Sequence, residues 1–147
     1  MQSTEPGRRL DHVVVVGANG VMGYGAGALF ARAGTKVTFL ARSSAEAEEG
    51  LAAAIKQAGC ETLPAFAETG SYMQDLETVV AGADLVIEAL AEDFSLKDGM
   101  FARVAAARQE NCIVGTVTSG LSINNLCANR DASFRRHFLG LHLFNPP

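Results

Sequence analysis

Glycine recurs at every third position in the stretch GANGVMG, residues 17 to 23. A turn of this kind exposes backbone N–H groups, and where it opens a helix the helix dipole adds partial positive charge. A pyrophosphate fits such a place, provided that no side chain blocks its approach. We therefore predict a dinucleotide site, and we assign six residues of the turn to it: Gly17, Asn19, Gly20, Val21, Met22 and Gly23. The alternative is a plain structural turn between a strand and a helix.

The spacing of these glycines differs by one residue from the usual dinucleotide fingerprint. That fingerprint is G-x-G-x-x-G, whereas the stretch here reads G-x-x-G-x-x-G. We interpret Asn19 as the extra residue, because asparagine tolerates left-handed backbone angles better than most residues.

The segments on both sides of the glycine turn have the patterns of a strand and a helix. Four consecutive valines, residues 13–16, precede the turn and are typical of a strand buried on both faces. Apolar residues at helical spacing follow it: Val21, Met22, Leu29 and Phe30. After a break at Gly34, a second β-branched run covers residues 37–40. Strand, turn, helix and strand within about 30 residues make one βαβ unit.

The alternation of strands and helices continues to the end of the chain. We expect further strands at residues 64–69, 84–89, 113–117 and 138–143, and helices at 45–58, 75–81, 97–107 and 122–128. Ser43 and Glu46 have the spacing of a capping box at the start of the helix at 45–58. This order predicts an α/β fold, a Rossmann-type doubly wound and mostly parallel sheet with helices on both faces. We expect residues 11–147 to form one dinucleotide-binding domain after a flexible tail of residues 1–10.

Composition excludes several classes of function. The chain has 147 residues, of which 48% are hydrophobic and 19% charged, as in a globular domain. A net charge of −4 argues against a nucleic-acid partner or a polybasic membrane surface. No apolar run approaches the ~20 residues that cross a bilayer. Cys60, Cys112 and Cys127 lack metal-ligand spacing, so we expect no metal, free thiols and a reducing cytoplasmic location.

The end of the second strand bears on the choice of cofactor. Enzymes that prefer NAD usually carry an acid there, which accepts hydrogen bonds from the adenosine ribose. Here the strand ends in Ala41 and Arg42, without an acid. The guanidinium of Arg42 could pair with a 2′-phosphate, which would make NADP an alternative to NAD. The competing interpretation is a solvated arginine at a helix start.

The last third of the chain resembles the L-3-hydroxyacyl-CoA dehydrogenases. Two stretches are similar to signatures of that family: TVTSGLSI, residues 116–123, and GLHLFNPP, residues 140–147. The stretch LVIEA at 85–89, with Glu92, Lys97 and Phe101 after it, is similar to the family's fourth strand and following helix. The resemblance extends from Val13 to the end of the chain, and it is nearest to the long family members that carry further domains.

The resemblance implies roles for single residues. His142 matches the histidine that takes the proton from the 3-hydroxyl of an acyl-CoA substrate, and Ser119 matches the serine that hydrogen-bonds the same oxygen. Glu92, Lys97, Ser119 and Asn145 match positions that contact the nicotinamide cofactor. Each has a simpler alternative: Glu92 as a helix-entry acid, Lys97 as a solvated helix residue, Ser119 as a turn cap and Asn145 as a bend before Pro146. We expect His12 and His137 to be ordinary surface residues.

Departures from the family pattern limit what the resemblance implies. Val117 stands where the family has asparagine, Ala41 where it has the acid, and the glycine turn has one extra residue. In the family, a glutamate that orients the histidine and an all-helical domain follow the residues corresponding to 140–147. We therefore expect the 147 residues alone to bind cofactor but to be nearly inactive, with an exposed apolar face that favours homo-oligomers.

The residues are also compatible with other functions. The chain could be a non-catalytic dinucleotide-binding module, or a structural module on the same fold. A dehydrogenase of another β-hydroxyacid group would share the first domain, although the residues at 142–146 disfavour it.

Overall fold

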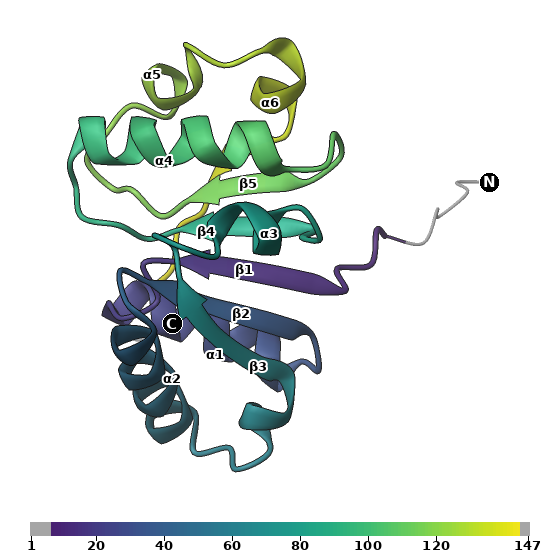
Figure 1. Cartoon of the computed structure of the whole chain (residues 1–147), viewed down its shortest axis with the longest axis vertical. Helices are drawn as coiled ribbons and strands as arrows, with labels where there is room; N and C mark the ends of the chain where they lie inside the picture. Colours follow the sequence, from purple (N-terminus) through teal and green to yellow (C-terminus); the bar gives the residue numbers. More distant parts are fainter. Residues whose placement is uncertain (1–6, 145–147) are drawn as a thin grey trace.

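Six parallel strands form one sheet at the centre of the molecule (Figure 1). The computed structural model describes residues 7–144, so the predicted contact at Asn145 lies outside the described residues. The strand order is β3-β2-β1-β4-β5-β6, and all five pairings are parallel. The strands are β1 (His12–Val16), β2 (Lys36–Ala41), β3 (Ala67–Ser71), β4 (Leu85–Glu88), β5 (Ile113–Thr116) and β6 (Phe138–Gly140). The predicted Rossmann-type sheet is confirmed, and the strand order reverses between β1 and β4.

Helices cover both faces of this sheet. They are α1 (Val21–Arg32), α2 (Ser44–Ala58), α3 (Leu76–Val80), α4 (Phe94–Ala107), α5 (Ile123–Cys127) and α6 (Ala132–Arg136). Helices α1 and α2 pack on β1, β2 and β3, whereas α4 packs against α3 and α5 (Figure 1). No helix within residues 7–144 has the length and apolar character needed to cross a membrane.

The valine run of β1 belongs to two hydrophobic cores. Val13 and Val15 face the α1 side and pack in one core with Phe39, whereas Val14 and Val16 pack in the other core with Phe101. All four valines are fully buried. Alternate side chains of a strand point to opposite faces, so an unbroken apolar run is what a central strand of a doubly covered sheet requires.

Most predicted elements are confirmed, with three differences. The capping box of Ser43 and Glu46 is present at the start of α2. Residues 63–66 form a 3-10 helix, η1 (Leu63–Phe66), with Pro64 in its first turn, where the missing N–H of proline costs no hydrogen bond. Helix α6 was not predicted; the Asp131 side chain caps it by accepting from the N–H of Phe134, whose ring is buried. The final strand ends at Gly140 rather than Leu143.

Two histidines are less exposed than the sequence predicts. His12 is half-buried, with Nε2 2.8 Å from Oγ1 of Thr38 and Nδ1 3.3 Å from the carbonyl oxygen of Gly82. Burial lowers its pKa below the ordinary value of 6.5. His137 is also half-buried, with Nδ1 2.8 Å from the carbonyl oxygen of Ser133. The prediction of surface histidines is therefore wrong for both.

Candidate functional site

The glycine turn follows β1 at the carboxyl edge of the sheet, beside the point where the strand order reverses. Gly17 has φ +88°, and a Cβ there would lie 2.6 Å from the carbonyl oxygen of Ala89. The N–H groups of Gly17 and Ala18 both donate to the carbonyl oxygen of Leu40, at 2.9 and 3.0 Å. The turn is thus hydrogen-bonded to β2 and packs closely against Ala89, which follows β4.

The extra residue of the turn does not behave as predicted. The sequence places at Asn19 a residue that tolerates left-handed backbone angles, but within residues 7–144 only glycines have positive φ. Gly17 supplies that conformation instead, and the N–H of Gly20 closes the turn on the carbonyl oxygen of Gly17 at 3.3 Å. Asn19 and Gly20 are both exposed.

The glycines of the turn serve different purposes. A Cβ on Gly23 would lie 2.2 Å from the carbonyl oxygen of Gly17, so the fold itself requires glycine there. A Cβ on Gly20 would meet nothing closer than that same oxygen at 3.7 Å, an ordinary contact. The space beside Gly20 is therefore open, and the fold does not explain the absence of a side chain.

Gly20 is also the N-cap of α1. No side chain caps this 12-residue helix, and its first turn has no acid. Its first N–H groups and its dipole are therefore available to an anion. An uncapped helix end with open space at its N-cap fits the pyrophosphate of a dinucleotide, so the residues present suit the cofactor that the sequence predicts.

A buried ionic network follows β4 at the same edge. Glu88 is 1% exposed, and its Oε2 lies 2.6 Å from Nζ of Lys97, which is fully buried. Lys97 also reaches Oε1 of Glu92 at 3.3 Å. The interpretation of Lys97 as a solvated helix residue is therefore wrong. Glu88 is not among the site residues predicted from the sequence, although a single acid inside the apolar run LVIEA is the signal that could have identified it.

Glu92 connects this network to the loop after β5. Its Oε2 accepts from the hydroxyl of Thr118 at 2.7 Å and from the N–H of Gly120 at 3.1 Å. Burial alone would raise the pKa of Glu92, but these hydrogen bonds and the charge of Lys97 together outweigh it and hold the pKa below its ordinary 4.5. The acid that caps α4 is Asp93, not Glu92. Glu92 is therefore no mere helix-entry acid.

Ser119 lies between the two residues that Glu92 holds. It is exposed, and its hydroxyl makes no hydrogen bond with any of residues 7–144. The turn is capped by Thr118, whose Oγ1 accepts from the N–H of Leu121 at 3.2 Å. The interpretation of Ser119 as the turn cap is wrong, and its hydroxyl remains available to a ligand.

His142 lies just past β6, next to the end of β5. The N–H of Leu141 donates to the carbonyl oxygen of Thr116 at 2.8 Å, which holds this segment at the carboxyl edge. The imidazole is exposed and packs edge-on against Phe144, with 5.6 Å between the ring centroids. Within residues 7–144 it has no hydrogen-bond partner. Ser119 and His142 therefore share one edge of the sheet, and both residues are exposed.

Arg42 follows β2 at the same edge. Its carbonyl oxygen accepts from the hydroxyl of Ser71 at 2.7 Å, which ties the ends of β2 and β3 together. The side chain is exposed, and its guanidinium has no hydrogen bond or ion pair within the described part of the chain. All predicted site residues between 17 and 142 therefore lie at or beside the carboxyl edge of the sheet, where open α/β sheets bind ligands.

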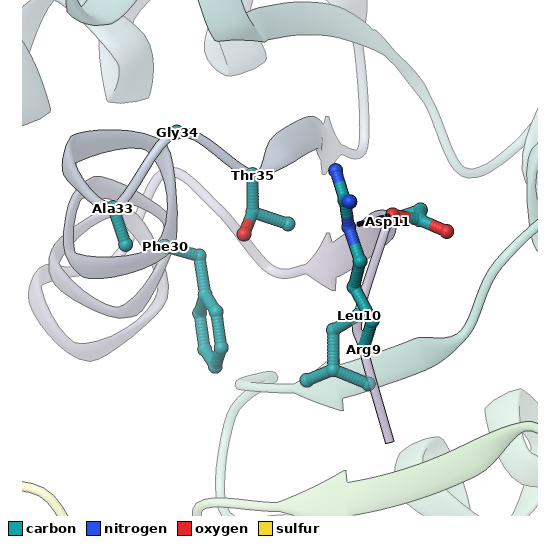
Figure 2. Close-up of a pocket in the computed structure, with 7 residues that line it drawn as sticks. All are labelled: Arg9, Leu10, Asp11, Phe30, Ala33, Gly34 and Thr35. Atoms are coloured by element: carbon teal, nitrogen blue, oxygen red, sulfur yellow. Dashed lines mark ion pairs between the residues drawn. The ribbon is translucent and has the colours of Figure 1, made fainter. Parts of the chain in front are cut away.

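A separate hollow of about 510 Å³ lies at the opposite edge (Figure 2). Its lining comes from the segments that precede β1 and β2, including Asp11 and Thr35, and from the end of α1, including Phe30. Arg9 and Asp11 form an exposed ion pair across 2.7 Å at its rim. The hollow is therefore not the predicted cofactor site.

Comparisons with known proteins agree with the resemblance. Residues 12–147 match the family model described as "3-hydroxyacyl-CoA dehydrogenase, NAD binding domain". The mitochondrial hydroxyacyl-coenzyme A dehydrogenase of Mus musculus is 34% identical over an alignment that covers 93% of this chain and 47% of the mouse protein. The chain thus spans about half the length of this relative.

Solved structures of similar proteins give the same result. The (S)-3-hydroxybutyryl-CoA dehydrogenase of Ralstonia eutropha superposes with a TM-score of 0.78 at 29% identity, covering 94% of this chain and 50% of that one. The dehydrogenase part of a multifunctional enzyme from C. elegans, at 24% identity, shares the fold with a TM-score of 0.82, covering 95% of this chain and 33% of that one. This chain therefore belongs to the family of NAD-binding domains of the 3-hydroxyacyl-CoA dehydrogenases.

Proposed function

We propose that this domain binds the nicotinamide cofactor of a 3-hydroxyacyl-CoA dehydrogenase and supplies the base for its reaction. The observation that carries the proposal is the uncapped N-terminus of α1 with open space at Gly20, at the strand-order reversal of a sheet whose family binds NAD. Gly17, Gly20, Val21, Met22 and Gly23, with Asn19, would hold the pyrophosphate. When bound, the nicotinamide ring accepts or returns a hydride at the carbon that carries the 3-hydroxyl.

The chain's own residues would manage the proton and the oxygen. His142 would take the hydroxyl proton on its imidazole and return it in the reverse direction, since an imidazole can act both as general base and as general acid. Ser119 would donate a hydrogen bond to the same oxygen. Glu92, Lys97 and Asn145 would belong to the nicotinamide half of the site. The exposed hydroxyl of Ser119 and the exposed imidazole of His142 support these roles.

We propose that the cofactor site accepts NADP as well as NAD. The position that would bond the adenosine ribose with an acid is Ala41, and Arg42 beside it is exposed without a protein partner among residues 7–144. A guanidinium there can pair bidentately with a 2′-phosphate. The carboxylate of Glu46 lies nearby in the capping box, where it accepts from the N–H of Ser43 at 3.0 Å and is occupied.

We further propose that the 147 residues bind cofactor but turn over acyl-CoA poorly on their own. The mouse relative is about twice as long as this chain, and within residues 7–144 no carboxylate orients His142. Leu139, within β6, is 39% exposed and Phe144, past its end, is 82% exposed, which supports self-association of this face. Three free cysteines, of which Cys112 and Cys127 are buried, support the reducing cytoplasmic location.

Calorimetric titration of the chain with NAD⁺, NADH, NADP⁺ and ADP-ribose tests the cofactor proposal. We expect saturable binding of all four, with one site per chain. A chain that binds none of them while folded, as judged by cooperative thermal unfolding, would leave only a structural module on the same fold.

A further inference from the structure

The carboxylate of Glu88 is enclosed by donors at the carboxyl end of β4. Oε1 accepts from the hydroxyl of Thr116 at 2.6 Å. Oε2 accepts from the N–H of Leu90 and from Nζ of Lys97, both at 2.6 Å. Three donors from β5, the loop after β4 and α4 therefore meet on one fully buried side chain.

The ammonium of Lys97 has three oxygen partners, two as hydrogen-bond acceptors and one as an ion-pair contact. They are Oε2 of Glu88 at 2.6 Å, the carbonyl oxygen of Leu90 at 3.0 Å and Oε1 of Glu92 at 3.3 Å. The resemblance assigns a cofactor contact to Lys97, but its side chain is fully buried. To reach a ligand, the ammonium would have to give up one of these three partners.

Glu92 connects the buried Glu88–Lys97 pair to the residues on either side of Ser119. One of its oxygens faces Lys97, and the other holds both Thr118 and Gly120, the neighbours of Ser119 on either side. The Glu92 side chain is 46% exposed, so it lies between the buried pair and the open edge of the sheet. The network contains two carboxylates and one ammonium. The buried charges of Glu88 and Lys97 balance each other, so the remaining negative charge is that of Glu92, at the surface.

We infer that Glu88 is a positioning residue: through Lys97 and Glu92 it fixes the turn at residues 118–120 and thereby the hydroxyl of Ser119. Lys97 acts in the same way, through Glu92. The inference rests on the proposed function, because it concerns the nicotinamide side of the same cofactor site. It explains an acid at the end of a buried strand, which the fold alone does not need.

A purely stabilising role of the Glu88–Lys97 pair and a positioning role predict different properties for the double variant. Removing one partner of a buried pair leaves an uncompensated charge and destabilises the fold, whereas replacing both partners is often neutral. Glu88→Gln and Lys97→Met should therefore each lower the thermal unfolding midpoint, and the double variant should recover it. If the network positions Ser119 through Glu92, the double variant still lacks the ammonium of Lys97. It should then recover stability but not its affinity for NADH.

The test compares NADH with ADP-ribose, which lacks the nicotinamide. We expect the Glu88→Gln/Lys97→Met chain to bind NADH about tenfold more weakly than the parent, the scale of a lost charge-assisted hydrogen bond, and to bind ADP-ribose equally well. Thr118→Val should show the same selective loss, and Thr118→Ser, which keeps the hydroxyl, should restore NADH affinity. The amide proton of Gly120 should shift in the NMR spectrum of the double variant.

The outcomes separate this inference from the proposed function. A parent chain that binds neither ligand overturns the proposed function and this inference together. A parent that binds both, with a double variant that regains stability and full NADH affinity, overturns this inference alone, because the pair would then serve only the fold. A double variant that loses the same affinity for NADH and for ADP-ribose would overturn this inference too.

Discussion

Gly50 of α2 lies directly against the carbonyl oxygen of Ala18, in the glycine turn. A Cβ on Gly50 would be 2.2 Å from that oxygen and 3.1 Å from the Cα of Asn19. Helix α2 therefore packs directly against the glycine turn. The candidate phosphate site depends on this close backbone contact. A glycine in a helix interior, which is otherwise unfavourable, has here a packing reason.

Replacement of Gly50 by alanine should destabilise the domain and weaken cofactor binding together. The new methyl group meets backbone atoms, which cannot rotate away, and overpacking of this kind costs about 1–3 kcal/mol. Gly99 of α4 is the matched control, because a Cβ there meets nothing within 4 Å, and Gly99→Ala should stabilise the helix by up to about 1 kcal/mol. Urea unfolding measures both. Equal effects of the two substitutions would contradict the contact.

Arg42→Ala should weaken NADP⁺ binding and leave NAD⁺ binding nearly unchanged. A lost charge-assisted hydrogen bond to a 2′-phosphate is worth about 1.5–3 kcal/mol, hence about tenfold or more in affinity. Arg136→Ala, an exposed arginine on α6, is the control. The affinity of the parent chain for NADP⁺ should also fall as the salt concentration rises. Equal loss for both cofactors, or none for either, would remove the role of Arg42.

The stability of the domain should fall as the pH is lowered through about 6.5, and His12 should account for part of that fall. Burial lowers the pKa of His12 in the folded chain, so the unfolded chain binds a proton that the folded chain resists. The contribution of His12 is therefore complete above its unfolded pKa and is lost as the pH falls toward its folded pKa. Urea midpoints between pH 7.5 and 5.5 should depend less on pH in His12→Gln. Identical slopes would show that the imidazole titrates normally.

Local patterns predicted the fold well, because its signals lie within short segments. The valine run, the glycine repeat and the capping box at Ser43 each act over a few residues, and each gave the right element. Contacts between distant residues could not be predicted in this way. The conformation of Asn19 depends on Gly17 taking the left-handed angles, and the partners of Glu88 come from β5 and α4. For Lys97, solvation and full burial are equally consistent with its helical neighbours.

The 147 residues alone should oxidise 3-hydroxybutyryl-CoA far more slowly than the same sequence extended through a helical domain of the kind its longer relatives carry. Loss of substrate positioning can forfeit a large part of the ~7–11 kcal/mol that orientation supplies. Nicotinamide absorbance follows the reaction, and a His142→Gln variant of the extended chain gives the background. Comparable turnover by the short and extended chains would show that His142 needs no further partner.

The most direct test of the account is the affinity of Gly20→Val for NAD⁺. The space at Gly20 is open in the fold, so the branched side chain should cost only the modest stability of a poorer N-cap but lie where the pyrophosphate is expected. Calorimetric titration should show affinity lower by at least about tenfold, which is about 1.4 kcal/mol of binding free energy. Gly99→Val, a glycine in open space on α4, should bind like the parent. Unchanged NAD⁺ affinity in a folded Gly20→Val chain would contradict the assignment of the cofactor site to the glycine turn.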